Sequence, residues 1–198
     1  MQRLARLDLL RVLATLVVYL HHFGLIFYIS AVAGVTKYQH GSWERIIYAT
    51  PIGIFANGSF AVHIFLVLSG FVLALPFYQA LERRPSAFSY VRRYSRLTIP
   101  IFTSVVLAYF VLHFGLIQAV PLGQATNSIP VLTELWQRAP QLGEALLCGV
   151  GKIYFLEDVD YNPVLWMMKY VMFGSFMLYI LLRLPSLKAR RLALVLCS

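Results

Sequence analysis

The chain has 198 residues, of which 60% are hydrophobic and only 13% are charged, and its formal net charge is +9 at pH 7. A soluble domain has about a quarter of its residues charged, and it cannot cover this much apolar surface with polar groups, whereas a bilayer solvates that surface. The composition therefore excludes an ordinary soluble domain. The clustering of Lys and Arg between apolar segments is typical of cytoplasmic loops of membrane proteins and argues against a nucleic-acid-binding protein.

The N-terminal apolar stretch is too long for a cleavable signal peptide, and it is interrupted by His21 and His22 rather than followed by a small-residue cleavage site. We expect it to remain as a first spanning helix. The two cysteines, Cys148 and Cys197, are too few and too far apart for a disulfide framework or a metal site.

Four apolar segments are long enough to cross a bilayer, which takes about 20 residues of helix. They are predicted as spanning helices from Leu9 or Val12 to Ala33, from Phe60 to Ala80, from Leu97 to Val120 and from Val164 to Leu182. A last apolar run, from Leu192 to Ser198, is too short to cross. The sequence thus predicts an all-α, polytopic transmembrane helix bundle with four full spans and an incomplete fifth, forming a single membrane domain over residues 1–198.

The segments between these spans differ in character. Glu144–Leu156 is apolar but only about half a span long, which is typical of a re-entrant or interfacial piece. Residues 34–57 and 121–143 carry the Pro, Gly, Asn and Gln that are expected of loops.

The distribution of basic residues predicts the orientation. With the N-terminus inside, twelve of the 17 Lys and Arg residues fall on the cytoplasmic side and five on the opposite side. Because cytoplasmic loops collect Lys and Arg, this split favours a cytoplasmic N-terminus in an integral, multi-pass membrane protein.

Two polar residues on the first predicted helix suggest chemistry. Arg11 and His22 are eleven positions apart, which places them within about 20° of one helical face and about 16 Å apart along the axis. His21 points well away from that stripe. A His in this position suits a general base, and a guanidinium suits phosphate or carboxylate. The alternative is that Arg11 extends to the interface and His22 only packs.

The second and third predicted helices carry further candidates. Ser69 and Gly70 are small residues that let helices approach closely, and Ser69 lacks the context of a nucleophile elbow, so packing is the favoured interpretation. Arg93 and Arg96, three positions apart, lie in a basic run that is expected to be cytoplasmic and to lead into the third helix. This run is either an anchor for anionic lipid or a docking patch for an acidic donor such as the phosphates of coenzyme A. On the fourth helix, Trp166 fits an interfacial aromatic belt.

Four stretches in this order resemble acyltransferase family 3, whose members are multi-pass membrane enzymes that move short acyl groups from acyl-coenzyme A to sugars and other hydroxyl-bearing acceptors. The stretches are Leu4–Gly24, with the family's spacing of its Arg and His, Ser59–Phe71, Arg92–Pro100 and Asn162–Ser175. The resemblance implies that His22 accepts the proton of the acceptor hydroxyl and that Arg11 helps to hold the donor. It also implies that Arg93 and Arg96 attract the donor phosphates, with supporting roles for Ser69, Gly70, Trp166 and Ser175.

The implied partners are membrane lipid, acyl-coenzyme A as a donor substrate rather than a bound cofactor, and a hydroxyl-bearing acceptor such as a carbohydrate. Two positions depart from the family pattern, because Val171 stands where an acidic residue is usual and Met167 where Thr is usual. The family domain is also longer, so the chain is expected to be its N-terminal part. A catalytically inactive remnant or membrane interaction protein is therefore an alternative, and a transporter or channel with Arg11 and His22 lining its path is a third.

Overall fold

The computed structural model describes residues 2–79, 84–127, 136 and 139–184. These residues form helices and connecting loops without any strand, which confirms the all-α prediction. The apolar run from Leu192 to Ser198 lies outside the described residues. The chain forms two compact units, unit 1 (residues 1–68 and 111–139) and unit 2 (residues 69–110 and 140–198), and each is described by itself. The single membrane domain stays a prediction.

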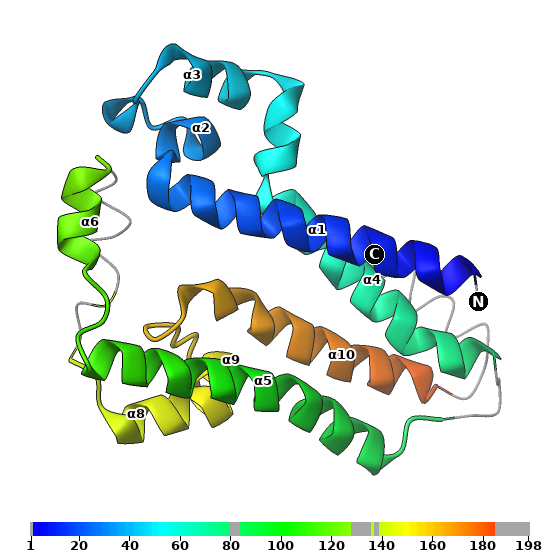
Figure 1. The fold of residues 1–198 in the computed structure, drawn as a ribbon. Coiled ribbons are helices and arrows are strands. Elements are labelled where there is room, and N and C mark those ends of the chain that lie inside the picture. The colour runs from blue at the N-terminus through cyan, green and yellow to red at the C-terminus, as the bar shows by residue number, and fades with distance from the viewer. Residues whose placement is uncertain (1, 80–83, 128–135, 137–138, 185–198) are drawn as a thin grey trace. The chain divides into compact units, whose positions relative to one another are not determined.

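Four helices are long and apolar enough to cross a membrane, as predicted. Between 11% and 28% of the residues in their apolar windows are buried within the described structure. In Figure 1 they are α1, α4, α5 and α10. Their spans are Leu7–Phe27 within α1 (Gln2–Phe27), Gly58–Gln79 (α4), Ala87–His113 (α5) and Pro163–Leu182, made of η4 (Pro163–Met167) and α10 (Met168–Leu182).

The first span ends earlier than expected. α1 stops at Phe27, and after Tyr28 the chain turns into the short helix α2 (Ile29–Ala33), which Gly34 ends in the left-handed region at φ 71°. α2 packs against α1, and a Cβ on Gly24 would collide with the Val32 side chain. Gly24 therefore permits a fold-back that the apolar pattern alone does not reveal.

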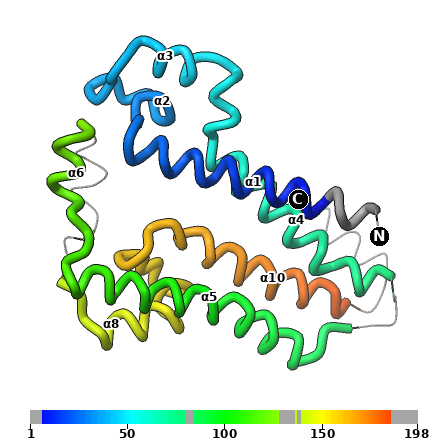
Figure 2. The backbone as a smooth tube through the Cα atoms, in the orientation of Figure 1, coloured from blue at the N-terminus to red at the C-terminus, as the bar shows by residue number. Residues whose placement is uncertain are grey.

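The third span is shifted toward the N-terminus relative to the prediction. α5 begins at Ala87, ten residues before Leu97, and ends at His113. The basic run that was expected to precede the helix is part of it (Figure 2). Arg is a good helix former, so the helix extends beyond the apolar stretch to a Ser86–Ser89 turn that caps its start. At the other end, Gly115 adopts φ 64° and ends the helical path.

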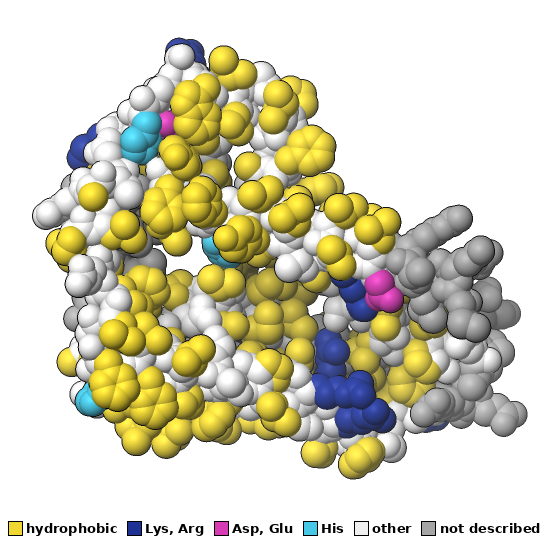
Figure 3. Space-filling view, viewed as in Figure 1, with side chains coloured by type: hydrophobic (Ala, Val, Ile, Leu, Met, Phe, Trp, Pro, Cys, Tyr) yellow, Lys and Arg dark blue, Asp and Glu magenta, His cyan; other side chains and the backbone are white. Residues whose placement is uncertain are grey.

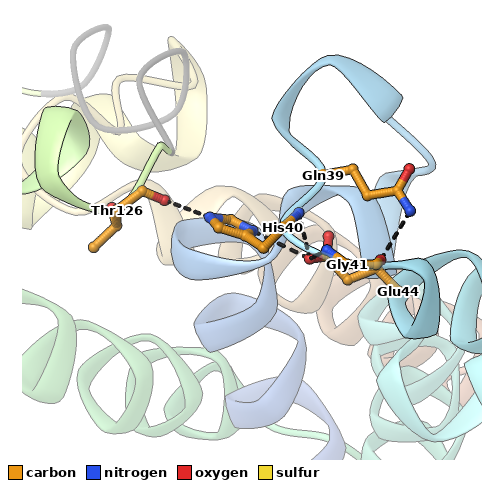
Figure 4. Close-up of polar contacts among 5 residues, drawn as sticks. All are labelled: Gln39, His40, Gly41, Glu44 and Thr126. Carbon is orange, nitrogen blue, oxygen red and sulfur yellow. Dashed lines mark hydrogen bonds and ion pairs between the residues drawn. The ribbon is translucent and has the colours of Figure 1, made fainter.

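Unit 1 contains short helices in both segments that were predicted as loops. They are η1 (Thr36–Tyr38), α3 (Ser42–Ala49), η2 (Pro51–Ala56) and α6 (Ala119–Ala125). α3 holds the fully buried Glu44, whose Oε1 accepts hydrogen bonds from the backbone N–H groups of His40 (2.8 Å) and Gly41 (3.2 Å), while its Oε2 has no hydrogen-bond partner among the described residues. The His40 ring lies 3.1 Å from the same oxygen through Nδ1, and its Nε2 donates to the Thr126 carbonyl at 2.8 Å (Figure 4).

In unit 2, the segment that was predicted as a re-entrant or interfacial piece forms a short helical layer. It consists of α8 (Leu142–Leu147), the π-helical turn η3 (Cys148–Lys152) and α9 (Ile153–Phe155), outside the four spans. The layer packs on α5, where Tyr94 donates to the Val150 carbonyl at 2.6 Å and the hydroxyls of Thr98 and Tyr154 are 3.0 Å apart. Its entry into the membrane stays a prediction.

Candidate active site

An arginine in unit 2 joins three spanning helices through hydrogen bonds. The Arg93 Nε–H donates to Ser175 Oγ at 3.0 Å, and its Nη2 donates to Ser69 Oγ at 2.9 Å. The three side chains come from α5, α10 and α4. The guanidinium is half-buried, and its planar fork is oriented by two separate helices. We call Arg93, Ser69 and Ser175 the arginine cluster.

The hydroxyl of Ser175 donates a hydrogen bond within its own helix. It donates to the Val171 carbonyl one turn earlier at 2.5 Å, so the oxygen is left to accept from Arg93. Ser175 is buried, and neither serine of the cluster has a histidine as a hydrogen-bond partner among the described residues. The two serines therefore orient a cation, and the geometry gives them no feature of an activated nucleophile.

Positive charge continues along the same helix. Arg92 and Arg96 are exposed on α5, and Lys and Arg side chains gather over its N-terminal half in Figure 3. An aromatic cluster packs below this part of α5, with the Tyr90 ring 5.1 Å from Tyr179 and the Phe77 ring 6.0 Å from Tyr179. The start of α5 thus carries exposed positive charge, and aromatic contacts pack it against α4 and α10.

The predicted stripe on α1 belongs to unit 1. Arg11 Nη1 lies 3.4 Å from Asp8 Oδ1, and the Arg11 side chain is 34% exposed. His22 is half-buried, its ring lies 5.7 Å from the ring of His21, and it forms no hydrogen bond within the part of the chain that the structure describes. The predicted site residues therefore fall into two groups, with Arg11 and His22 in unit 1 and the arginine cluster in unit 2.

Sequence reasoning missed the role of His21. Its Nδ1 lies 2.8 Å from the carbonyl oxygen of Ala56, and its ring lines a cavity of about 530 Å³ in unit 1. A Cβ on Gly58 would collide with this ring, so the glycine permits the contact. No local sequence pattern around Ala56 points to His21, which lies 35 positions earlier.

Two titratable groups in the helical layer of unit 2 are held neutral. Burial, and then the nearby negative charge of Asp158, raises the pKa of the Cys148 thiol to about 12. The thiol is fully buried and donates to the Asp158 carbonyl at 3.1 Å. Burial also raises the pKa of Tyr154. Cys148 is therefore not an activated nucleophile, since the thiolate is the reactive form.

The family model of acyltransferase 3, described as an acyltransferase domain, matches residues 4–198. The chain belongs to the acyltransferase 3 family. This confirms the predicted family, and with the four apolar helices it supports an integral membrane acyltransferase. None of the curated proteins and none of the solved structures matches the chain.

The other positions singled out in this acyltransferase 3 chain form fewer contacts with the arginine cluster and its helices in the described structure. A Cβ at Gly70 would meet no heavy atom within 4 Å in the described structure, so close helix approach does not require this glycine. Trp166 is exposed, and its ring lies 6.2 Å from that of Tyr170. Val171 contributes only its carbonyl to the arginine cluster, as acceptor for Ser175. Their roles stay predictions.

Proposed function

We propose that this acyltransferase 3 protein moves an acyl group, in the simplest case acetyl, from acyl-coenzyme A to a hydroxyl of an acceptor such as a carbohydrate. The observation that carries the proposal is the arginine cluster. Its two serines accept hydrogen bonds from the Arg93 guanidinium and so fix its direction. A fixed guanidinium fork suits the oxygens of a phosphate, and coenzyme A carries several phosphates.

The positive charge of α5 around Arg93 also supports acyl-coenzyme A as the donor. Arg92 and Arg96 are exposed near Arg93 and raise the local concentration of an anionic substrate. With the N-terminus inside, as twelve of 17 basic residues favour, the start of α5 lies on the cytoplasmic side, where acyl-coenzyme A is made.

The reaction needs a base and a positioned thioester. In this proposal His22 takes the proton from the acceptor hydroxyl while the oxygen attacks the thioester carbonyl carbon. The tetrahedral intermediate then collapses, the carbon–sulfur bond breaks, and the coenzyme A thiolate leaves and takes up the proton. Arg93 and Arg96 attract the donor phosphates, and Arg11 keeps the role that the family resemblance implies, which is to help hold the donor.

Acyl transfer by purified protein tests this proposal. Protein in lipid nanodiscs is given acetyl-coenzyme A labelled in the acetyl group and a mixture of hydroxyl-bearing acceptors. We expect labelled ester from the wild type and a loss of at least about 100-fold in His22→Ala, because a general base contributes at least that much. His63→Ala is the matched control, since His63 is an exposed histidine on α4. Equal rates in a normally folded His22→Ala variant contradict the proposal, and a wild type without transfer favours the inactive alternative.

A further inference from the structure

The cavity beside His21 has the size and lining of a ligand site. It measures about 530 Å³, within the range of small-molecule pockets, and it lies where the end of α1 meets α2, α3, η2 and the start of α4. Half of its ten lining residues are polar, and none is Lys, Arg, Asp or Glu. The polar ones are His21, Tyr48, Thr50, Asn57 and Ser59. An uncharged polar ligand therefore fits this lining best.

His21 is fixed in one tautomer when it is neutral. A carbonyl oxygen only accepts hydrogen bonds, so the 2.8 Å contact with Ala56 requires the proton on Nδ1. Nε2 is then the acceptor nitrogen, and it has no partner within the described residues. A histidine oriented in this way by a third group is arranged to accept the proton of a hydroxyl.

The other polar groups supply the complementary hydrogen bonds. Asn57 Oδ1 accepts from the Phe60 N–H at 3.0 Å, which leaves its amide N–H groups as donors. Thr50 donates its hydroxyl proton to the Ile46 carbonyl at 2.7 Å, so its oxygen is left to accept. A cavity that offers both acceptors and donors without charge matches neighbouring hydroxyl groups, since each hydroxyl donates and accepts.

The backbone around the cavity is built for close packing. A Cβ on Gly58 would collide with the His21 ring, and a Cβ on Gly53 would lie 2.8 Å from the Ile47 carbonyl oxygen. These glycines let η2 and the start of α4 approach the histidine and the end of α3. The ring of His21 is thereby held at the cavity wall from the side of α4.

We propose that this cavity binds the hydroxyl-bearing acceptor, an uncharged polyhydroxylated molecule of about monosaccharide size, with His21 Nε2 accepting a hydrogen bond from one of its hydroxyls. The role as acceptor site rests on the proposed function, whereas binding of such a molecule does not require acyl transfer. His21 is thus an acceptor-binding residue next to the predicted base His22.

Direct binding tests the inference without any donor. Full-length protein in nanodiscs, free of glycoside detergent, is titrated with methyl β-D-glucopyranoside by saturation-transfer NMR, and the fully O-methylated glucoside serves as the hydroxyl-free probe. We expect the wild type to bind only the glucoside with free hydroxyls, and His21→Gln to weaken its binding by about tenfold or more. His63→Gln is the matched control and stays within about twofold, because His63 makes the same kind of Nδ1 contact, to the Ser59 carbonyl, outside the cavity.

A second measurement uses the wild type alone and so does not depend on the folding of a variant. Diethyl pyrocarbonate modifies unprotonated imidazole nitrogens, and saturating glucoside is expected to slow modification of His21 but not of His63. Absence of glucoside binding by the wild type, binding unchanged in His21→Gln, or no protection of His21 each overturns the inference. Protection of His21 without acyl transfer contradicts the proposed function alone, and transfer without protection contradicts the cavity assignment alone.

Discussion

At the scale of single residues, the best-defined feature is a cation that two serines orient. Arg93 donates to Ser69 and Ser175, and each hydrogen bond from a charged donor contributes about 1.5–3 kcal/mol. The contacts restrict the rotamers of a long side chain before any ligand arrives, so less conformational entropy is lost on binding. Arg93 is therefore pre-organised, whereas the exposed Arg96 adds charge without a fixed direction.

Cys148 gives a residue-scale prediction that depends on pH. Its pKa is raised to about 12, so the thiol stays neutral at pH 8 and forms thiolate only as the pH approaches 12. The test uses a Cys197→Ser background. N-ethylmaleimide should label Cys148 in the folded protein at least about 100-fold more slowly than in the same protein unfolded in detergent. The reason is that the unfolded thiol has an ordinary pKa near 8.5 and supplies far more thiolate. Rapid labelling of the folded protein at pH 8 would show that the thiol is neither buried nor held neutral.

At the scale of elements, the π-helical turn η3 packs closely against the backbone of α5. A Cβ at Gly149 would lie 3.0 Å from the backbone Cα of Phe102, whereas a Cβ at Gly151, two residues later, would meet nothing within 4 Å. The backbone of a spanning helix cannot yield as a flexible side chain does. The turn therefore depends on a small residue at one of its two glycine positions and not at the other.

This contrast predicts opposite effects of the same substitution. Gly149→Ala should destabilise the protein by about 1–3 kcal/mol, the usual cost of overpacking. Gly151→Ala should be neutral or stabilising by up to about 1 kcal/mol, since Ala has the better helix propensity. Thermal unfolding of the two variants in nanodiscs compares them directly, and equal melting temperatures would refute close packing of η3 on α5.

At the scale of the whole molecule, hydropathy was sufficient for the number and nature of the spans. A membrane helix must satisfy its own backbone hydrogen bonds over about 20 apolar residues, so its signal is local and strong. The boundaries of the spans were less predictable. The break after Phe27 depends on the close approach of Gly24 and Val32. The start of α5 at Ala87, ahead of the apolar stretch, depends on arginines that favour helix.

The site residues were harder to predict than the spans. The contact of Arg93 with Ser69 and Ser175 depends on the relative register of three helices, which no periodicity within one helix encodes. The contact of His21 could not be predicted for the same reason, because its partner Ala56 is 35 residues away along the chain. Analysis of the α1 face alone favoured Arg11 and His22, and their catalytic roles stay predictions.

The orientation of the molecule is a further prediction at this scale. With the N-terminus inside, Ser42 in α3 lies outside and Ser86 before α5 lies inside, and both side chains are exposed. In a Cys197→Ser background, a membrane-impermeant maleimide should label Ser42→Cys in intact cells and Ser86→Cys only after permeabilisation. The buried Cys148 contributes little signal. The reverse labelling pattern would show that the N-terminus lies outside.

Equilibrium binding of coenzyme A tests the central claim, that the arginine cluster holds the donor, most directly. Wild type, Arg93→Lys and Arg45→Lys are compared by isothermal titration calorimetry in nanodiscs, with Arg45 as an exposed arginine of α3 in unit 1. Lys keeps the charge but cannot bridge two serines and a phosphate as a planar fork does, so Arg93→Lys should raise Kd by about tenfold or more. Arg45→Lys should leave Kd unchanged. Equal Kd values for all three proteins, or no binding by the wild type, would contradict the claim.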